Sequence, residues 1–449
     1  MTITAFDDAH DRLAHLHDTI DALLQEAKRR GATAAEAVVS GSAGIEVAVR
    51  LGEVETVEHT RDNGLSLSVY FGHCKGSAST SDLSPAAVRE AVRAACAIAS
   101  HTQPDTCAGL ADPARLATEI PDLDLYHPWD LSVEEAIRIA VACEDAARAA
   151  DPRITNSEGA SLSSHAGVQV YGNSHGFIAG YPTTRHGLSC AVIGQDGDSM
   201  QRDYWWTNAR AAADLEDPER VGRRAAERTV ARLGARQIGT CQAPVLFRAE
   251  VATGLLRNLT GAINGAALYR RASFLLDHLG QRIFPGFVRI YEDPLLPRGL
   301  SSAPFDGEGV ATAAKDFVTE GVLRSYVLDT YSGCRLGMPT TGNAGGVRNL
   351  HIAMGPLDLP GLLREMGTGL LVTELMGSGV NPVTGDYSRG AAGFWVEGGE
   401  IAFPVEEITI AGNLKRMYQG LLAVGNDCDF PGSTRTGSWL IDEMTIAGH

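Results

Sequence analysis

Apolar residues between positions 11 and 30 recur every three or four residues, as they do on one face of a helix. They are Leu13, Leu16, Ile20, Leu23, Leu24 and Ala27. A second helix is predicted from Ser84 toward His101, because serine is a favoured N-cap and Pro85 suits the first helical position. Similar patterns predict helices over 132–150 and about 218–233.

Strand patterns separate these helices. Residues 44–60 and 64–72 alternate apolar and polar side chains, and Asp62–Gly64 (Asp-Asn-Gly) predicts a turn between them. Residues 167–194 also have the composition of strands joined by turns.

The second half of the chain contains fewer helical patterns and more glycine. Helices are predicted over about 249–264 and near 359–367, and the Gly-Gly pair in "VEGGEIAFPV" predicts a hairpin turn. Helices and strands are segregated rather than alternating, which favours an α+β fold. We expect two domains: an N-terminal domain of mixed sheet and helix, 1–235, and a β-rich C-terminal domain, 236–449.

Composition narrows the class of protein. The 449 residues are 44% hydrophobic with a net charge of −17, which argues against a broad nucleic-acid-binding face. Eight scattered cysteines indicate a reducing compartment rather than a disulfide framework. The acidic N-terminus does not resemble a signal peptide, and no stretch is apolar enough to span a membrane. We therefore expect a cytoplasmic protein.

Two short sequence patterns resemble a catalytic site and a metal site, but each has an ordinary structural explanation. "GNSHG", 172–176, matches a nucleophile elbow with Ser174 as the nucleophile, yet strand-like residues on both sides favour a hairpin turn. His165, His175 and His186 share one strand-rich stretch, but their spacing matches no standard metal motif. A serine hydrolase using Ser174 is the least favoured function.

The chain contains, in this order, the segments "KGSASTSDLSP", "EVATGLL", "TELMGSGV", "GDYSRGAAGFWVE" and "EITIAGNLK". These segments and their order resemble the TldD/PmbA peptidase family, and in particular its PmbA-type, or TldE-type, members. The resemblance implies an α+β two-domain fold, a cytoplasmic location and a role in proteolysis. It also implies a TldD-type partner that forms a heterodimer with this chain and carries zinc for cleaving small, unfolded or modified peptides.

The resemblance further implies where the metal chemistry would lie. TldD-type subunits have a His-Glu-x-x-x-His sequence, and the matching positions here are Ala249, Glu250 and Gly254. Alanine and glycine side chains have no donor atoms, and Cys428 alone makes no stable zinc site. We therefore expect no metal and no cofactor in this chain, with Glu250 a structural residue at the general-base position.

The expected role of this subunit is to shape the peptide chamber. Asp386, Tyr387, Arg389 and Gly390 are the candidates for facing it, because Gly-rich strands suit backbone pairing with a peptide. A turn with a structural Asp-Arg pair is the alternative. The rival function is a non-catalytic regulatory homodimer of the gyrase-modulator type, and a homodimer is also possible for the isolated chain.

Overall fold

The computed structural model describes residues 9–448. Most of the acidic N-terminal stretch, and the outer ends of both expected domains, therefore lie outside the described residues. Helices and strands occur in separate runs around three sheets, so the α+β prediction is confirmed. The domain boundary at 235/236 stays a prediction. Within the described chain no helix is long and apolar enough to cross a membrane.

The N-terminal half is built on one long antiparallel sheet with the strand order β3-β2-β1-β4-β5-β6. The strands are β1 (Ala34–Arg50), β2 (Glu53–Phe71), β3 (Cys74–Thr80), β4 (Ile154–Asn173), β5 (Ile178–Asp196) and β6 (Ser199–Ala209). The helices are α1 (Ala9–Arg29), α2 (Pro85–Ala99), α3 (Val133–Ala150) and α4 (Pro218–Ala231). All four helices were predicted, and Ser84 caps α2 by accepting a hydrogen bond from the Ala87 amide.

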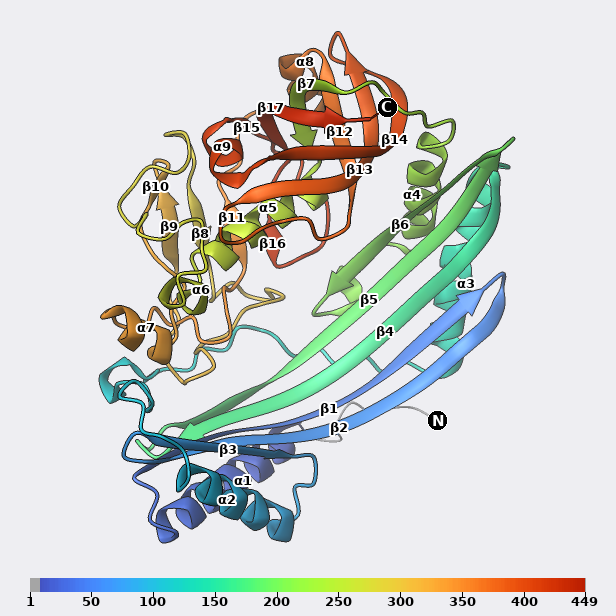
Figure 1. The fold of residues 1–449 in the computed structure, drawn as a ribbon. Coiled ribbons are helices and arrows are strands. Elements are labelled where there is room, and N and C mark those ends of the chain that lie inside the picture. Colours follow the sequence, from blue (N-terminus) through green and yellow to red (C-terminus); the bar gives the residue numbers. More distant parts are fainter. Residues whose placement is uncertain (1–8, 449) are drawn as a thin grey trace.

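The alternation of buried and exposed side chains along β1 shows which face of this sheet the helices cover. The odd-numbered residues 35–39 of β1 are buried with α1 and α2, and the odd-numbered residues 45–49 are buried with α3 and α4. Both helix pairs therefore cover the same face, at opposite ends (Figure 1). At one end of the opposite face, Phe305 of the C-terminal half packs against Phe177 and Tyr181. The sheet curves around the C-terminal half (Figure 1).

The turn predicted at Asp62–Gly64 is wrong. Those residues lie inside β2, where Asn63 pairs with Gly41 of β1. The chain reverses instead at Leu51 and Gly52, which have φ values of 54° and 80°. A two-residue hairpin turn needs positive φ at both central residues, and here the register of two very long strands outweighs the local turn signal.

The C-terminal half contains the other two sheets. One sheet has the order β10-β9-β8-β11-β16, and the other has the order β14-β13-β12-β7-β17-β15. Because β14 also pairs with β17, the second sheet closes on itself. The predicted hairpin between β13 and β14 is confirmed, with Gly398 and Gly399 at φ 60° and 83°.

The strands of this half are β7 (Cys241–Phe247), β8 (Ile290–Glu292), β9 (Lys315–Thr319), β10 (Val322–Leu323), β11 (Leu350–Ile352), β12 (Gly369–Met376), β13 (Asp386–Glu397), β14 (Glu400–Asn413), β15 (Leu421–Val424), β16 (Thr434–Arg435) and β17 (Trp439–Ala447). The helices are α5 (Ala249–Ala262), α6 (Gly265–Tyr269), α7 (Thr330–Leu336), α8 (Leu359–Met366) and α9 (Leu414–Gln419).

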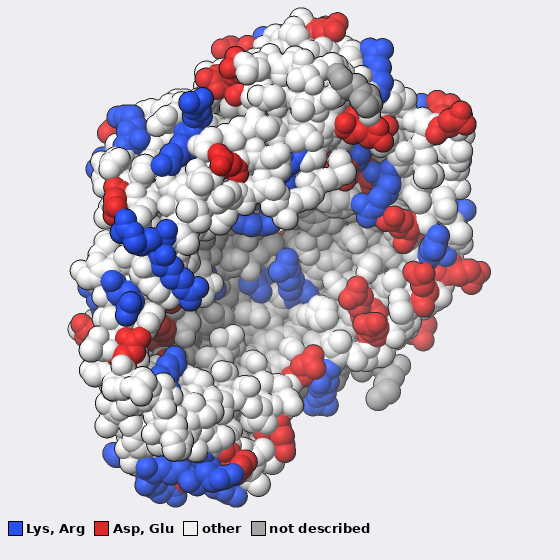
Figure 2. Space-filling model, in the orientation of Figure 1, with Lys and Arg blue, Asp and Glu red and all other residues white. Residues whose placement is uncertain are grey.

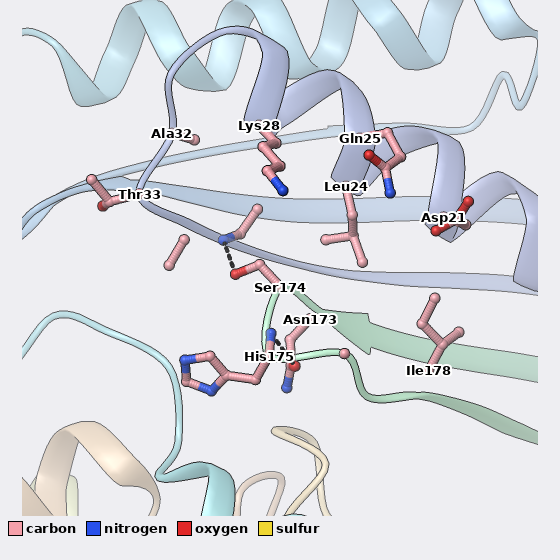
Figure 3. A pocket seen from close by; sticks show the side chains of 13 residues that line it. Asp21, Leu24, Gln25, Lys28, Ala32, Thr33, Asn173, Ser174, His175 and Ile178 are labelled. Atoms are coloured by element: carbon pink, nitrogen blue, oxygen red, sulfur yellow. Dashed lines mark hydrogen bonds between the residues drawn. The ribbon is translucent and has the colours of Figure 1, made fainter.

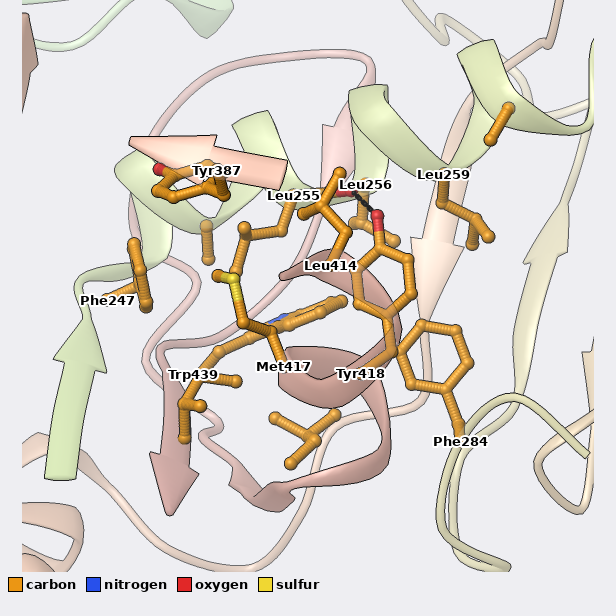
Figure 4. Close-up of a cluster of buried hydrophobic side chains, with 14 of the residues drawn as sticks. Phe247, Leu255, Leu256, Leu259, Phe284, Tyr387, Leu414, Met417, Tyr418 and Trp439 are labelled. Carbon is orange, nitrogen blue, oxygen red and sulfur yellow. Dashed lines mark hydrogen bonds between the residues drawn. The ribbon is translucent and has the colours of Figure 1, made fainter. Parts of the chain in front are cut away.

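The largest core lies between α5 and the closed sheet (Figure 4). The Tyr418 hydroxyl donates a 2.9 Å hydrogen bond to the Leu255 carbonyl, and the Tyr418 ring stacks on Phe284 at 4.6 Å. Trp439 is fully buried beside them. Aromatic rings of this size bury much apolar surface, so they hold α5 firmly against the sheet.

One disulfide bond joins distant parts of the chain. Cys107 follows α2 and Cys334 lies on α7, 227 residues later, with their Cα atoms 5.5 Å apart. The other six cysteines are free. This bond departs from the expectation of scattered, unpaired cysteines, and the reducing compartment stays a prediction. The spacing of the cysteines carried no signal for this bond.

Gly222 lets α3 and α4 approach closely, because a Cβ atom at this position would lie 2.0 Å from the Cys143 carbonyl oxygen. We expect Gly222→Ala to lower the free energy of unfolding by about 2 kcal/mol, since the two helices must separate. Gly254→Ala is the matched control: its Cβ would meet no atom within 4 Å, and removing a mid-helix glycine should add about 0.5–1 kcal/mol. Urea unfolding measures both, and equal effects would contradict the prediction.

Candidate functional site

Helix α5 begins immediately after β7, in the middle of the closed sheet. β7 lies between β12 and β17, so the first turn of α5 emerges next to the contact between the two halves. Ala249 is 1% exposed and packs in the N-terminal half's core, against which Cys428 also packs. Ala249 and Cys428 therefore contribute to the same core, although they come from distant parts of the chain.

Glu250 is held in a buried ion pair. Its Oε1 accepts a 2.7 Å hydrogen bond from Arg228 on α4, and Arg248 lies 3.4 Å from the same oxygen. The Glu250 and Arg228 side chains are 9% and 11% exposed. Burial alone would lower the pKa of Arg228, but Asp203 and Glu250 together raise it above its usual value. Arg228 is therefore a fixed positive charge beside the Glu250 carboxylate.

The residues around Glu250 do not fit a zinc ion. Ala249 and Gly254 offer no donor atom, although a side chain at Gly254 would meet open space. Across residues 9–448, no three His, Cys, Asp or Glu side chains are grouped so that they could hold a metal. At α5, zinc binding is therefore prevented by the chemistry of the side chains and not by a lack of space beside the helix.

Sequence reasoning missed Arg228 because it comes from a different element. The weak signal available was an arginine within the Ala- and Arg-rich helix 218–231, where Arg220 and Arg223 are exposed to solvent. Arg228 instead points between α4, β6 and α5, and its second contact is Asp203 at 3.2 Å.

The three histidines of the 165–186 stretch do not converge. His186 is buried: its Nδ1 lies 2.9 Å from the Ser164 hydroxyl and its Nε2 lies 3.0 Å from the His127 carbonyl. Burial lowers the pKa of His186. His165 is one residue along β4 from Ser164 and so faces the other side of the sheet, whereas His175 lies in the β4–β5 turn. Their ordinary structural interpretation holds.

Ser174 lies in a hairpin turn and not in a nucleophile elbow. Its amide donates to the Ala35 carbonyl at 2.8 Å, and its hydroxyl accepts from the Ala35 amide at 3.0 Å (Figure 3). The ring of His175 points away from Ser174 (Figure 3). A strand follows the turn, so the strand–turn–helix geometry of an elbow is missing.

The β13 candidates divide into two environments. Tyr387 is 2% exposed and lies in the core, 6.5 Å from the Phe247 ring (Figure 4). Asp386 is exposed and accepts hydrogen bonds from Thr384 and Asn413. Tyr387 thus contacts the core of this chain, while a chamber role for the others stays a prediction.

Arg389 and Gly390 lie on the same strand, next to β12. Arg389 donates to the carbonyl oxygens of Leu375 and Met376, each at 3.4 Å, and Gly390 lies against Met376. Since Asp386 and Arg389 bond to different partners, the structural Asp-Arg pair considered as an alternative is not formed. Both residues remain candidates for facing the chamber.

The fold and site define an α+β protein in which a curved antiparallel sheet faces a closed sheet. Its α5 begins with one carboxylate, Glu250, which is paired with Arg228, while Ala249 and Gly254 on the same helix offer no donor atom. Three family models match the chain: PmbA/TldA metallopeptidase domain 1 over residues 35–99, the central domain over 126–233 and the C-terminal domain over 240–448. The chain belongs to the PmbA/TldD metallopeptidase family.

Individual relatives, compared by sequence or by structure, agree with this family assignment. The chain is 53% identical to the metalloprotease PmbA of Escherichia coli, covering 92% of each chain, and 48% identical to a PmbA homolog of Haemophilus influenzae, covering 97% of this chain and 96% of that one. A crystal structure titled a putative modulator of DNA gyrase, from Bacteroides thetaiotaomicron, matches with a TM-score of 0.91 at 28% identity, covering 96% of this chain and 98% of that one. TldE from Thermococcus kodakarensis shares the fold, with a TM-score of 0.83 at 21% identity, and covers 96% of this chain and all of its own.

Replacing the buried carboxylate should destabilise the protein. We expect Glu250→Gln to lower the free energy of unfolding by about 1–3 kcal/mol, because Arg228 loses a charge-assisted hydrogen bond in a buried site. Glu219→Gln is the control: it breaks an exposed α4 ion pair with Arg223 and should cost less than about 0.5 kcal/mol. Urea unfolding of both variants checks this, and equal costs would mean that the Glu250 pair contributes no more than an exposed one.

Ser174 should not react as a nucleophile. We expect no covalent labelling of the isolated chain by a fluorophosphonate probe, under conditions that label a serine protease added as positive control. Ser174→Ala should lower the free energy of unfolding by about 1 kcal/mol, since the Ala35 amide loses its acceptor. Mass spectrometry detects labelling, and a label that disappears in Ser174→Ala would restore the serine hydrolase hypothesis.

Proposed function

We propose that this chain is the non-catalytic, PmbA/TldE-type subunit of a cytoplasmic zinc-dependent peptidase. In this proposal a TldD-type partner carries the zinc, and the complex cleaves small, unfolded or modified peptides. The observation that supports this proposal most directly is the Arg228–Glu250 ion pair. Glu250 is the only side chain on α5 that could serve as a general base, and it is already bound to Arg228.

Metal-assisted peptide hydrolysis requires a Lewis acid, a water molecule bound to it and a base within reach of that water. Ala249 and Gly254 supply no ligand for the Lewis acid. The Glu250 Oε1 is already a hydrogen-bond acceptor for Arg228, and its Oε2 is buried without a hydrogen-bond partner in the described chain. This chain therefore contributes peptide-binding surface and the partner contributes the chemistry.

The first test is reconstitution with a TldD-type partner. We expect this chain alone to hold no stoichiometric zinc and to cleave no peptide, whereas the mixed complex should cleave unfolded peptides until a chelator removes the metal. Elemental analysis of untagged protein and peptide cleavage, followed by mass spectrometry, give the two measurements. About one tightly held zinc per isolated chain would overturn the proposal.

Variants of the complex locate the catalytic base. Glu250→Gln, compared at equal amounts of folded complex, should keep cleavage within about twofold of the unmodified rate. Replacing the partner's matching glutamate should reduce the rate by several orders of magnitude. If the Glu250 variant is the inactive one, the catalytic centre is in this chain. If no partner restores cleavage and the chain forms only homodimers, the regulatory function replaces the peptidase function.

A further inference from the structure

A cavity of about 400 Å³ lies between the two halves of the chain. Its walls come from the end of β6, the segment 296–300, β11 and the residues around β16. These segments meet at the centre of the molecule (Figure 1). The space-filling view shows a hollow between the N-terminal sheet and the C-terminal half, with Lys or Arg side chains inside it (Figure 2). We call this space the interdomain cavity.

The interdomain cavity contains positive charge that no carboxylate balances. The Arg435 side chain on β16 is exposed and forms no hydrogen bond or ion pair with any residue of 9–448. Arg210 is 8% exposed, and its guanidinium donates only to carbonyl oxygens, those of Thr184, Gly299 and Leu300. Carbonyl oxygens satisfy its donors but leave its charge uncompensated.

Another cation, Arg185, lies near Arg210. Burial, and then the nearby Arg185, lower the pKa of Arg210, as expected where cations gather. Arg298 is the exception among the arginines of the cavity, because it pairs with Asp124 and Asp214. Because the chain has a net charge of −17, its composition does not lead us to expect two arginines without a carboxylate partner in one cavity.

His351 adds a polar atom that lacks a partner. It lies on β11 beside Arg435, and its ring stacks on Tyr291 at 5.1 Å, which fixes its orientation. Its Nε2 is buried and has no hydrogen-bond partner within the described residues. Buried polar atoms are nearly always bonded, so this nitrogen needs a partner, and His351 is one of the residues that line the cavity.

Apolar side chains also line the interdomain cavity. Leu296 and Met354 are 38% and 41% exposed, which is high for residues of this kind in a cavity wall. A ligand that fits must therefore combine an anionic group with an apolar group. A peptide residue with a carboxylate and an apolar side chain has this combination, and about 400 Å³ can hold one or two residues of that size.

We propose that the interdomain cavity binds a carboxylate of the peptide substrate, with Arg435 and His351 as its contacts and Arg210 supplying a fixed positive field. The proposal rests on the function proposed above and adds the substrate class, namely peptides that end in a free carboxylate beside an apolar side chain. Arginine is suited to this role because its planar guanidinium donates two parallel hydrogen bonds to a carboxylate.

The test measures binding by the isolated full-length chain, so no cleavage is needed. Three fluorescent-labelled hexapeptides of equal length serve as probes: one ends in leucine with a free carboxylate, one ends in leucine amide, and one is the amide with an internal glutamate. Fluorescence anisotropy should show the acid binding about tenfold more tightly than the amide, and added salt should reduce this difference.

Arg435→Gln should weaken binding of the acid about tenfold and leave the amide unchanged. Arg257→Gln is the matched control, since it removes one exposed, unpaired arginine from α5 outside the cavity. The glutamate-containing amide distinguishes the two sources of a carboxylate. If it binds like the plain amide, the terminal carboxylate is the ligand, and if it binds like the acid, the proposed substrate class of peptides with a free carboxylate at their end is wrong.

Equal binding of acid and amide, no binding of either, or equal losses in the Arg435 and Arg257 variants would overturn the proposal. These outcomes are separate from failure of the proposed function, which is judged by zinc content and cleavage in the reconstituted complex. A complex that cleaves acid and amide peptides equally well would keep the proposed function and remove the carboxylate site.

Discussion

A buried network of charges centred on Arg228 joins the two halves of the protein. Arg228 on α4 bonds to Asp203 on β6 and to Glu250 on α5. Arg232, one turn further along the chain, lies 3.5 Å from Asp203 and pairs with Glu374 on β12. The side chains of Arg228, Arg232, Asp203 and Glu250 are 11% exposed or less, whereas Glu374 is 38% exposed. The buried charges must stay paired, because leaving one buried alone costs several kcal/mol. The four elements therefore keep one arrangement, and the curved sheet keeps its position against the C-terminal half.

This arrangement has two consequences for function. The Glu250 carboxylate contributes to holding the halves together through its ion pair with Arg228, so it has a structural role on α5. The fixed position of the sheet also leaves the interdomain cavity between the halves, where Arg210 and Arg435 concentrate positive charge in a strongly acidic chain. At physiological ionic strength the distant negative charges are screened within about 8 Å, so the local arginines dominate for a bound carboxylate.

Much of the secondary structure could be predicted from the sequence because its causes are local. The helical spacing and the Ser84–Pro85 start define α1 and α2, and the pair Gly398–Gly399 defines the hairpin between β13 and β14. The hairpin at Ser174 was also readable from the strand patterns on both sides. The Asp62–Gly64 turn failed because pairing along two long strands, which is not local, outweighed a three-residue preference.

The sequence by itself determined which atoms are available: Ala249 and Gly254 have no metal-binding atoms, whatever the fold. Only the tertiary structure decided what the remaining side chains do. It buried Tyr387 in the core, and it paired Glu250 with Arg228, which lies 22 residues earlier. It also brought four distant segments together as the interdomain cavity. The physical reason is that side-chain chemistry belongs to each residue alone, whereas burial and electrostatic partners depend on contacts between residues far apart in the chain.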